Sequence, residues 1–353
     1  MIDVLDLHRR LVAIRSLSHE EDAIADFLEG YLRAEGSEVE RVGRNVIARA
    51  GSGRRLLLNS HYDTVPATDK WTRDPWEASV EDGQVFGLGS NDAKASVAAM
   101  TAAFLEHADR GGPGEVALVI VCEEETGGEG TEVAWPHLRD ANWVPDGVVV
   151  GEPTNLQIAI AQKGLMILEL VAEGDGGHAA NVAITGARNA VTAIAHDLAG
   201  LDGLDLGPPH PLLGSTSLQP TRLQGGEARN MVPVQATCVL DLRTVPGLSH
   251  EELRGRVQAH VQSEVRVISD RLGARECASD AEVVSAARLA RPQAELFGSS
   301  TMSDLVFFEG GPAIKCGPGR SERSHQPDEF VRESEILEGA AFYTRLIQEF
   351  MRG

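Results

Sequence analysis

Hydrophobic residues in the first half of the chain alternate between helical and extended patterns. Apolar positions recur at helical spacing in residues 5–12 and 24–32, which predicts two amphipathic helices. Short apolar runs predict strands at 45–50, 56–58, 116–121 and 148–150. The alanine-rich segment 94–107 predicts a helix among them. Strands that alternate with helices predict an α/β sheet with right-handed crossovers.

The pattern changes after residue 163. Strands are predicted at 166–171, 217–223, 235–242 and 264–268, and helices at 187–198 and 251–262. The order strand–helix–strand–strand–helix–strand is that of a ferredoxin-like α+β module. We therefore predict an inserted module over residues 164–278, within a discontinuous domain formed by residues 1–163 and 279–353.

Composition and charge narrow the class of protein. A chain of 353 residues is too long for one ordinary core, which agrees with two domains. Its net charge of −21 argues against nucleic acid or an anionic membrane as a partner. No secretory signal is recognised, and no apolar stretch reaches the ~20 residues that span a bilayer. Four cysteines without a Cys-x-x-Cys pair predict a cytoplasmic protein.

Acidic or imidazole side chains stand at five places, each just beyond an apolar run or at the start of a helical run. These places are His61-Tyr62-Asp63, Asp92, Glu123-Glu124-Glu125, Glu152 and His325. Carboxylate oxygens and imidazole nitrogens suit zinc or a close relative. Two histidines and three carboxylates can hold two such ions if one carboxylate bridges them. Paired ions can activate water and polarise a carbonyl.

Each of these residues also has a simpler interpretation. His61 and Asp63 project to one face of an extended segment, so Asp63 can orient a ligating His61, but both can also be surface residues. Asp92 can merely cap the helix that follows it. The glutamates 123–125 can form a solvated loop, because charge runs are usually exposed.

Taken in order along nearly the full chain, these motifs resemble the M20 metallopeptidase family, which includes acetylornithine deacetylase, succinyl-diaminopimelate desuccinylase and several di- and carboxypeptidases. The resemblance implies an α/β fold: a mixed-sheet, zinc-peptidase-like catalytic domain with an inserted ferredoxin-like lid that forms a homodimer. It implies two divalent ions, zinc or alternatively cobalt, held by His61, Asp92, Glu125, Glu152 and His325. Asp92 is then the bridging ligand, and the Asp92–Ala93 peptide bond is cis.

The resemblance also implies roles for residues around the metals. Glu124 becomes the general acid/base, with Asp63 as a second catalytic group. His178, in the loop Gly174-Asp-Gly-Gly-His178, is implied to reach the partner subunit's site and stabilise an oxyanion. Asn230 and Arg243 are implied to bind substrate, and the guanidinium of Arg243 suits a carboxylate.

Within the family, the segments 151–154, 317–319 and 325–329 favour deacetylases that act on N-acetylornithine or N-acetyl-lysine in arginine or lysine biosynthesis. The expected substrate is thus a small N-acylated amino acid. Succinyl-diaminopimelate desuccinylase and an M20 di- or carboxypeptidase are the alternatives, and a metal-free scaffold or binding protein is the alternative of another class. Two departures stand out: Glu123 replaces the family's aspartate, and two extra residues precede Ser303, which leaves its role open.

Overall fold

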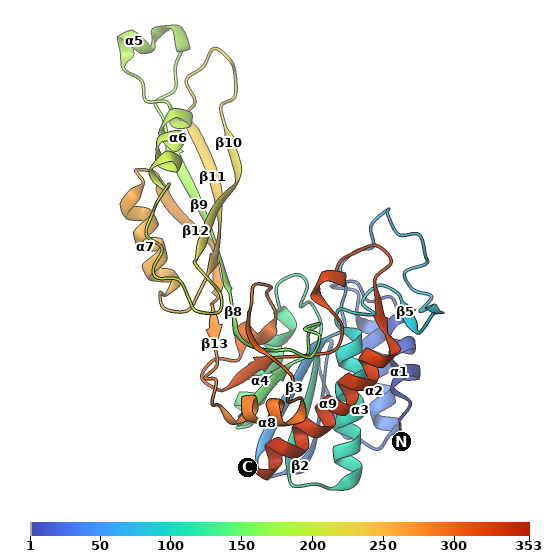
Figure 1. The fold of residues 1–353 in the computed structure, drawn as a ribbon. Helices are drawn as coiled ribbons and strands as arrows, with labels where there is room; N and C mark the ends of the chain where they lie inside the picture. The colour runs from blue at the N-terminus through green and yellow to red at the C-terminus, as the bar shows by residue number, and fades with distance from the viewer. Residues whose placement is uncertain (1) are drawn as a thin grey trace. The chain divides into compact units, whose positions relative to one another are not determined.

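The computed structural model describes residues 2–353, which divide into two compact units (Figure 1). The first unit is the chain up to Ile160 with Cys277–Phe297 and Ser303–Gly353, and the second is Ala161–Glu276 with Gly298–Met302. The sequence placed residues 298–302 in the surrounding domain, but they group with the second unit. One cause is a hydrogen bond of 3.0 Å from the Lys163 amide to the Ser299 carbonyl.

A mixed sheet forms the centre of the first unit, although residues 161–162, 275–276 and 298–299 of its strands are grouped with the second unit. Its strands are β1 (Val39–Val42), β2 (Asn45–Ser52), β3 (Arg55–His61), β6 (Gly114–Val121), β7 (Gly147–Val150), β8 (Ile158–Gln162), β13 (Arg275–Glu276), β14 (Leu296–Ser299) and β15 (Ala313–Lys315). Their order is β1-β2-β6-β3-β7-β15-β8-β13, and β14 pairs with β8. β3 runs parallel to β6 and β7, and β7 runs parallel to β15, so these strands end at one edge of the sheet.

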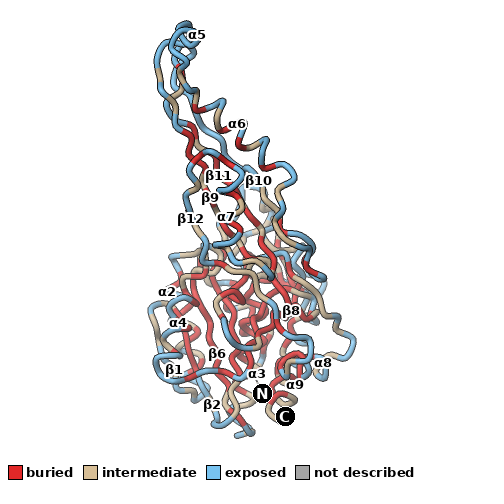
Figure 2. Tube along the Cα trace, turned by 90° about the vertical axis from the view of Figure 1, so that its left-hand side faces the viewer, coloured by how far each residue is buried: buried red, intermediate tan, exposed pale blue. Residues whose placement is uncertain are grey.

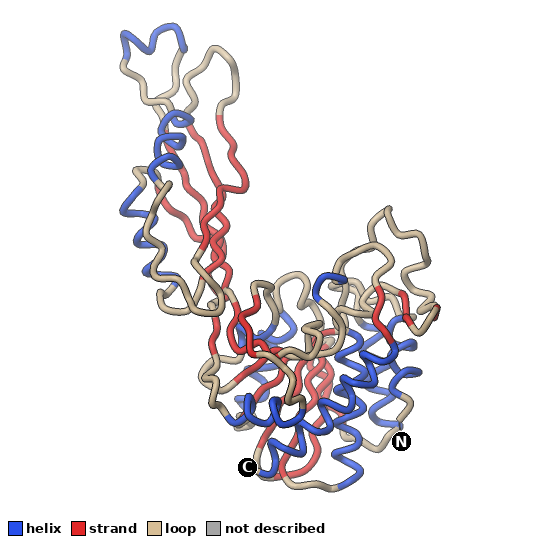
Figure 3. Tube along the Cα trace, viewed as in Figure 1, coloured by secondary structure: helices blue, strands red, loops and turns tan. Residues whose placement is uncertain are grey.

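Helices cover both faces of this sheet (Figure 3). They are α1 (Val4–Val12), α2 (Asp22–Ala34), α3 (Lys94–Arg110), α4 (Glu129–Asp140), α8 (Glu282–Ala290) and α9 (Glu333–Arg352). Leu56 and Leu58 enter the core shared with α1, α2, α3, α8 and α9, whereas Leu57 enters the core beneath α4. Successive strand residues point to opposite faces, so a strand covered on both sides needs the continuous apolar run seen in the sequence.

Some elements were not predicted from the sequence, or were predicted with different bounds. Helix α4 was not predicted; it contains Pro136, which usually ends a helix. The short strands β4 (Val80–Glu81), β5 (Gln84–Phe86) and β16 (Phe330–Arg332), which form a small separate sheet, were also missed. The helix expected from residue 187 begins instead at Ala190, because the side chain of Asn189 accepts a hydrogen bond from the Thr192 amide and caps it.

The second unit has the predicted ferredoxin-like order of elements. Its strands are β9 (Gly164–Glu173), β10 (Ser217–Gly225), β11 (Gln235–Thr244) and β12 (Glu264–Leu272), and its helices are η1 (Ala179–Asn181), α5 (Val182–Thr185), α6 (Ala190–Gly200) and α7 (His250–His260). The strands pair antiparallel in the order β10-β11-β9-β12. Helices α6 and α7 share a core with β9 and β11, which appear buried in Figure 2, whereas β10 at the sheet edge is largely exposed.

Candidate metal centre

The parallel strands bring the predicted ligands to one edge of the first unit's sheet. His61 is the last residue of β3, the glutamates 123–125 follow β6, and Glu152 follows β7. Because the carboxyl ends of neighbouring parallel strands meet, residues that are far apart in the sequence become neighbours here. The structure thus gives a common cause for the positions of these residues just after apolar runs.

His61, Asp92 and Glu152 form one group of possible ligands. Their nearest ligand atoms lie within 4.8 Å of one another. The Nε2 atom of His61 is 3.4 Å from Asp92 Oδ1 and 3.7 Å from Glu152 Oε1. All three side chains are buried or nearly so.

Asp92, Glu125 and His325 form a second group of the same size. The Nε2 atom of His325 is 2.9 Å from Glu125 Oε1 and 3.9 Å from Asp92 Oδ2. Asp92 therefore belongs to both groups, with one carboxylate oxygen toward each histidine. The predicted cis peptide bond between Asp92 and Ala93 is confirmed. Between them the two groups contain all five predicted ligands.

The side chains of this centre fit divalent cations. Asp92 Oδ1 and Glu152 Oε1 are buried and accept no hydrogen bond within residues 2–353. Burial and the nearby charge of Asp92 raise the pKa of Glu152 to about 8. Such crowded carboxylates are costly unless a cation neutralises them. Carboxylate oxygens and imidazole nitrogens are also the usual donors for zinc and related metals.

Asp63 lies behind His61 and is completely buried. Its oxygens accept hydrogen bonds from Ser18 Oγ at 2.8 Å and from the amides of Glu124 and Glu125 at 3.1 Å each. The Nδ1 atom of His61 is 3.2 Å from Asp63 Oδ1. Burial opposes ionisation, but the contact with His61 lowers the pKa of Asp63 below its usual value. Asp63 therefore fixes the imidazole with Nε2 toward Asp92 and Glu152.

Glu124 belongs to neither group that contains Asp92, but its carboxylate forms a third group with His61 and Glu125. Burial raises its pKa well above the ordinary value, and the charge of Glu152 adds to this effect. Asp304, which the sequence did not assign, is a further source of negative charge there. Its carboxylate accepts a hydrogen bond from Thr131 Oγ1 at 2.8 Å. Its position after Ser303 in an identifiable motif was the signal that could have found it.

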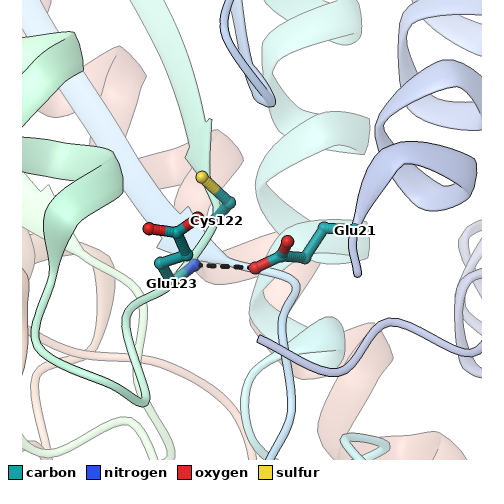
Figure 4. Close-up of side chains that lie close together, drawn as sticks. All are labelled: Glu21, Cys122 and Glu123. Atoms are coloured by element: carbon teal, nitrogen blue, oxygen red, sulfur yellow. Dashed lines mark hydrogen bonds between the residues drawn. The ribbon is translucent and has the colours of Figure 1, made fainter. Parts of the chain in front are cut away.

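A separate cluster of Glu21, Cys122 and Glu123 also brings possible ligand atoms together (Figure 4). The amide of Glu123 donates to Glu21 Oε1 at 3.1 Å. The guanidinium of Arg44 already supplies a cation: its Nε is 3.0 Å from Glu21 Oε2, and it also pairs with Glu123. Burial raises the pKa of the Cys122 thiol to about 11. Glu21 and Glu123 therefore already form ion pairs with Arg44.

Two of the three residues expected in the inserted module lie together. His178 caps η1, and its Nδ1 accepts a hydrogen bond from the Ala180 amide at 3.1 Å. The preceding amide, that of Ala179, donates to the Asn230 carbonyl at 2.9 Å. Arg243 is not with them: it lies at the other end of β11 and holds Asp241 through two hydrogen bonds of 2.9 and 3.1 Å.

A family model described as peptidase family M20/M25/M40 matches residues 57–349. The chain belongs to this family. It is accordingly a metal-dependent hydrolase that acts on amide bonds, and the family includes dinuclear metal-binding members.

Individual relatives have several different names. The chain is 28% identical to succinyl-diaminopimelate desuccinylase 2 of Ruegeria sp., covering 99% of this chain and 95% of that protein. It is 25% identical to acetylornithine deacetylase of Pectobacterium carotovorum, with coverage of 98% and 97%. It is 34% identical to a putative [LysW]-lysine/[LysW]-ornithine hydrolase of Pyrobaculum aerophilum, with coverage of 71% and 69%.

The fold is also that of solved family members. An M20 family metallo-carboxypeptidase from Sulfolobus solfataricus superposes with a TM-score of 0.80 over 100% of both chains at 17% identity. A dinuclear metal-binding M20 peptidase from Bacillus subtilis superposes with a TM-score of 0.70 at 16% identity, covering 97% of this chain and 96% of that one. The mixed α/β fold is therefore confirmed.

Proposed function

We propose that the protein removes an acyl group, in the first place acetyl, from an N-acylated amino acid such as N-acetylornithine or N-acetyl-lysine in arginine or lysine biosynthesis. The observation that carries the proposal is the position of Asp92 between two histidine–carboxylate groups, with Glu124 beside them. The relative named acetylornithine deacetylase supports the choice of substrate. The relative named desuccinylase makes a succinylated substrate the competing candidate.

We propose that His61, Asp92 and Glu152 hold one divalent cation and that Asp92, Glu125 and His325 hold the other. Zinc is the proposed metal, with cobalt as the alternative, because the donors are oxygen and imidazole nitrogen. When bound, the pair of cations would supply polarisation of the amide carbonyl and of a water molecule. Asp63 keeps the His61 ring in the orientation that this requires.

Glu124 is the proposed general acid/base. Its carboxylate takes a proton from the attacking water as the new C–O bond forms, and the carbonyl oxygen becomes negative. The same group then gives the proton to the amide nitrogen as the C–N bond breaks, which releases the acid and the free amine. Burial raises the pKa of Glu124 above its ordinary value, which favours a group that must hold the proton between these two steps.

His178, Asn230 and Arg243 are proposed to act on the substrate. In neutral His178, a hydrogen bond accepted at Nδ1 places the proton on Nε2, so the exposed ring has an N–H to offer an oxyanion. We propose that His178 does so in the partner subunit of a homodimer formed through the inserted module. Arg243 is proposed to bind the carboxylate of the amino acid, for which it must exchange Asp241 as its partner.

The cellular setting is proposed on two further observations. Cys122, Cys238, Cys277 and Cys316 are buried and form no disulfide within residues 2–353, which supports a reducing cytoplasm. Among residues 2–353, no helix is long and apolar enough to cross a membrane. A small-molecule substrate agrees with the net charge of −21, which argues against nucleic acid as a partner, and with membership of the M20 family.

A substrate panel tests the proposed activity. The metal-loaded protein is assayed with N-acetylornithine, N-acetyl-lysine, N-succinyl-diaminopimelate and dipeptides, and the released amine is measured. We expect the highest kcat/KM with an acetylated amino acid and no turnover after the metal has been stripped. Preference for the succinylated substrate or for a dipeptide by tenfold or more would replace the proposed substrate.

A further inference from the structure

The turn that carries Asp92 is bound by a residue more than two hundred positions later, Glu329. Glu329 Oε1 accepts hydrogen bonds from the amides of Asn91 at 2.8 Å and Asp92 at 2.9 Å. Its other oxygen accepts from the Gly89 amide at 3.0 Å. Glu329 is only 2% exposed. One buried carboxylate therefore accepts hydrogen bonds from three backbone amides of this turn.

The main chain of Glu329 holds the same turn. Its carbonyl accepts from the Gly87 amide at 2.9 Å and from Ser90 Oγ at 3.3 Å. This position follows from strand pairing, because β16 is antiparallel to β5 and Phe330 lies opposite Phe86. The residue before Phe330 is thereby placed against the residue after Phe86. Side chain and main chain together fix the path of the turn.

The segment that ends at Glu329 also supplies His325. A second contact joins it to the turn: Asn91 Oδ1 accepts from the Arg320 amide at 2.8 Å, and Asn91 Nδ2 donates to the Arg320 carbonyl at 3.0 Å. The turn 87–92 and the segment 320–329 thus form one hydrogen-bonded assembly. That assembly contains Asp92 and His325, and His325 Nε2 is 3.9 Å from Asp92 Oδ2.

Burial of the Glu329 carboxylate costs free energy unless hydrogen bonds or charges compensate for it. Glu329 is buried and contacts the turn of Asp92, a second carboxylate, so its ionised form is costly in this place. Three amide donors compensate for the cost. Glutamine, which has the same size, cannot accept all three hydrogen bonds, because its NH₂ group is not an acceptor.

We propose that Glu329 is a positioning residue for the metal centre: it holds Asp92 and His325 at the separation needed to bind a cation together with Glu125. The proposal rests on the proposed function only in requiring that the centre binds divalent cations. Glu329 itself touches the backbone of Asp92 and acts through it. Mutation of a residue that hydrogen-bonds to a metal ligand typically changes metal affinity 10–100-fold.

Glu329→Gln is the direct test, and Asp328→Asn is its matched control. Asp328 is the neighbouring carboxylate and also accepts backbone hydrogen bonds, from the amides of Thr72 at 2.9 Å and Arg73 at 3.2 Å. Those donors belong to a loop without any proposed ligand. We expect Glu329→Gln to weaken binding of one cation about 10–100-fold and Asp328→Asn to leave both affinities unchanged.

Stripped wild-type and variant proteins are titrated with Co²⁺ and, against a competing chelator, with Zn²⁺, so the readout is binding and does not involve turnover. Wild-type affinity for both cations in Glu329→Gln, or an equal loss in Asp328→Asn, would overturn the proposal. If Glu329→Gln does not fold, Glu329→Asp is titrated instead. This variant keeps the charge but has a shorter side chain, and wild-type affinity for both cations would again overturn the proposal. If the wild type binds two cations but hydrolyses nothing in the substrate panel, the proposed function fails and this proposal stands.

Discussion

At the scale of single residues, the carboxylates near His61 differ in what already binds them. The oxygens of Asp63 are taken by Ser18 and by two backbone amides. One oxygen of Asp92 accepts no hydrogen bond within residues 2–353 and faces His61. The carboxylate of Glu124 lies close to His61 and Glu125, and burial raises its pKa well above the ordinary value. A carboxylate whose oxygens already accept hydrogen bonds can orient a ligand, an unsatisfied buried one can bind a cation, and one with a raised pKa can move a proton.

This contrast predicts the effect of Glu124→Gln. The amide cannot take a proton from water, so kcat should fall by about 10²–10⁴-fold or more. Both cations should still bind, because Glu124 contributes to neither group that contains Asp92. Metal content and turnover are measured on the same preparation, with the exposed Glu322→Gln as the control. Near-normal turnover in a variant that retains its metals would remove Glu124 from the mechanism.

The sequence could predict the proposed ligands, and also Asp63 two residues after His61, but not the supporting residues that are distant in the chain. His61 and Glu152 carry reactive groups and each follows or ends an apolar run, which makes them visible. Glu329 acts on backbone amides of a turn far away in the chain, and Arg44 acts on a distant carboxylate. Such contacts leave no spacing pattern, because any turn has amides to offer.

At the scale of elements, the loop after β6 is shaped by Arg44. Glu123 has a φ of +59°, a left-handed conformation that is uncommon for a residue with a side chain. Its amide binds Glu21 and its carboxylate binds Arg44, whose own carbonyl accepts a hydrogen bond from Tyr62. Arg44 therefore ties the loop of Glu124 to the segment between His61 and Asp63.

Arg44→Met should destabilise the first unit. It leaves Glu21 fully buried without its cation, and breaking a buried ion pair costs about 3–5 kcal/mol. Because the Arg44 side chain is 28% exposed, we expect a smaller loss of about 2–3 kcal/mol in the free energy of unfolding.

Denaturant unfolding followed by tryptophan fluorescence measures this loss, since all four tryptophans lie in the first unit. The double variant Glu21→Gln/Arg44→Met is the control, and it should lose less than the two single variants added together. Additive losses, or a loss below about 0.5 kcal/mol in Arg44→Met, would show that the ion pair does not hold this loop.

Element prediction worked best where burial dictated the sequence. The core strands β6 and β7 are covered on both faces and therefore had to be continuous apolar runs. The strands β4, β5 and β16 have only two or three residues each, too few for a periodic pattern. Helix α4 was hidden by Pro136 and by its mixture of polar and apolar positions.

At the scale of the whole molecule, the proposed catalytic groups are divided between two units. The metal-binding candidates and Glu124 belong to the first unit, whereas His178 and Asn230 belong to the second. The order of strands and helices allowed the ferredoxin-like module to be predicted from the sequence. A periodic pattern in the sequence cannot predict whether His178 acts in its own subunit or in its partner, because this depends on how the subunits assemble.

A mixing experiment addresses that assembly. His178→Ala lacks the proposed oxyanion donor, whose loss should reduce kcat by about 10²–10³-fold. Glu124→Gln lacks the proposed base. If His178 acts in the partner subunit, a heterodimer of the two variants contains one site with an intact Glu124 from one chain and an intact His178 from the other. Subunit exchange at equal concentrations should then restore activity to about one quarter of the wild-type value, since half the dimers are mixed and each has one good site.

The control mixes His178→Ala with the double variant Glu124→Gln/His178→Ala. Its subunits exchange in the same way, but no intact histidine is present, so activity should stay at the level of the parents. Exchange itself is followed with two differently tagged chains, which separates failure to mix from failure to complement. Exchange without recovery in the first mixture would mean that His178 serves its own chain or has no catalytic role. Recovery in the first mixture alone would require both a dimer and a histidine delivered across it, because neither parent contains a complete site.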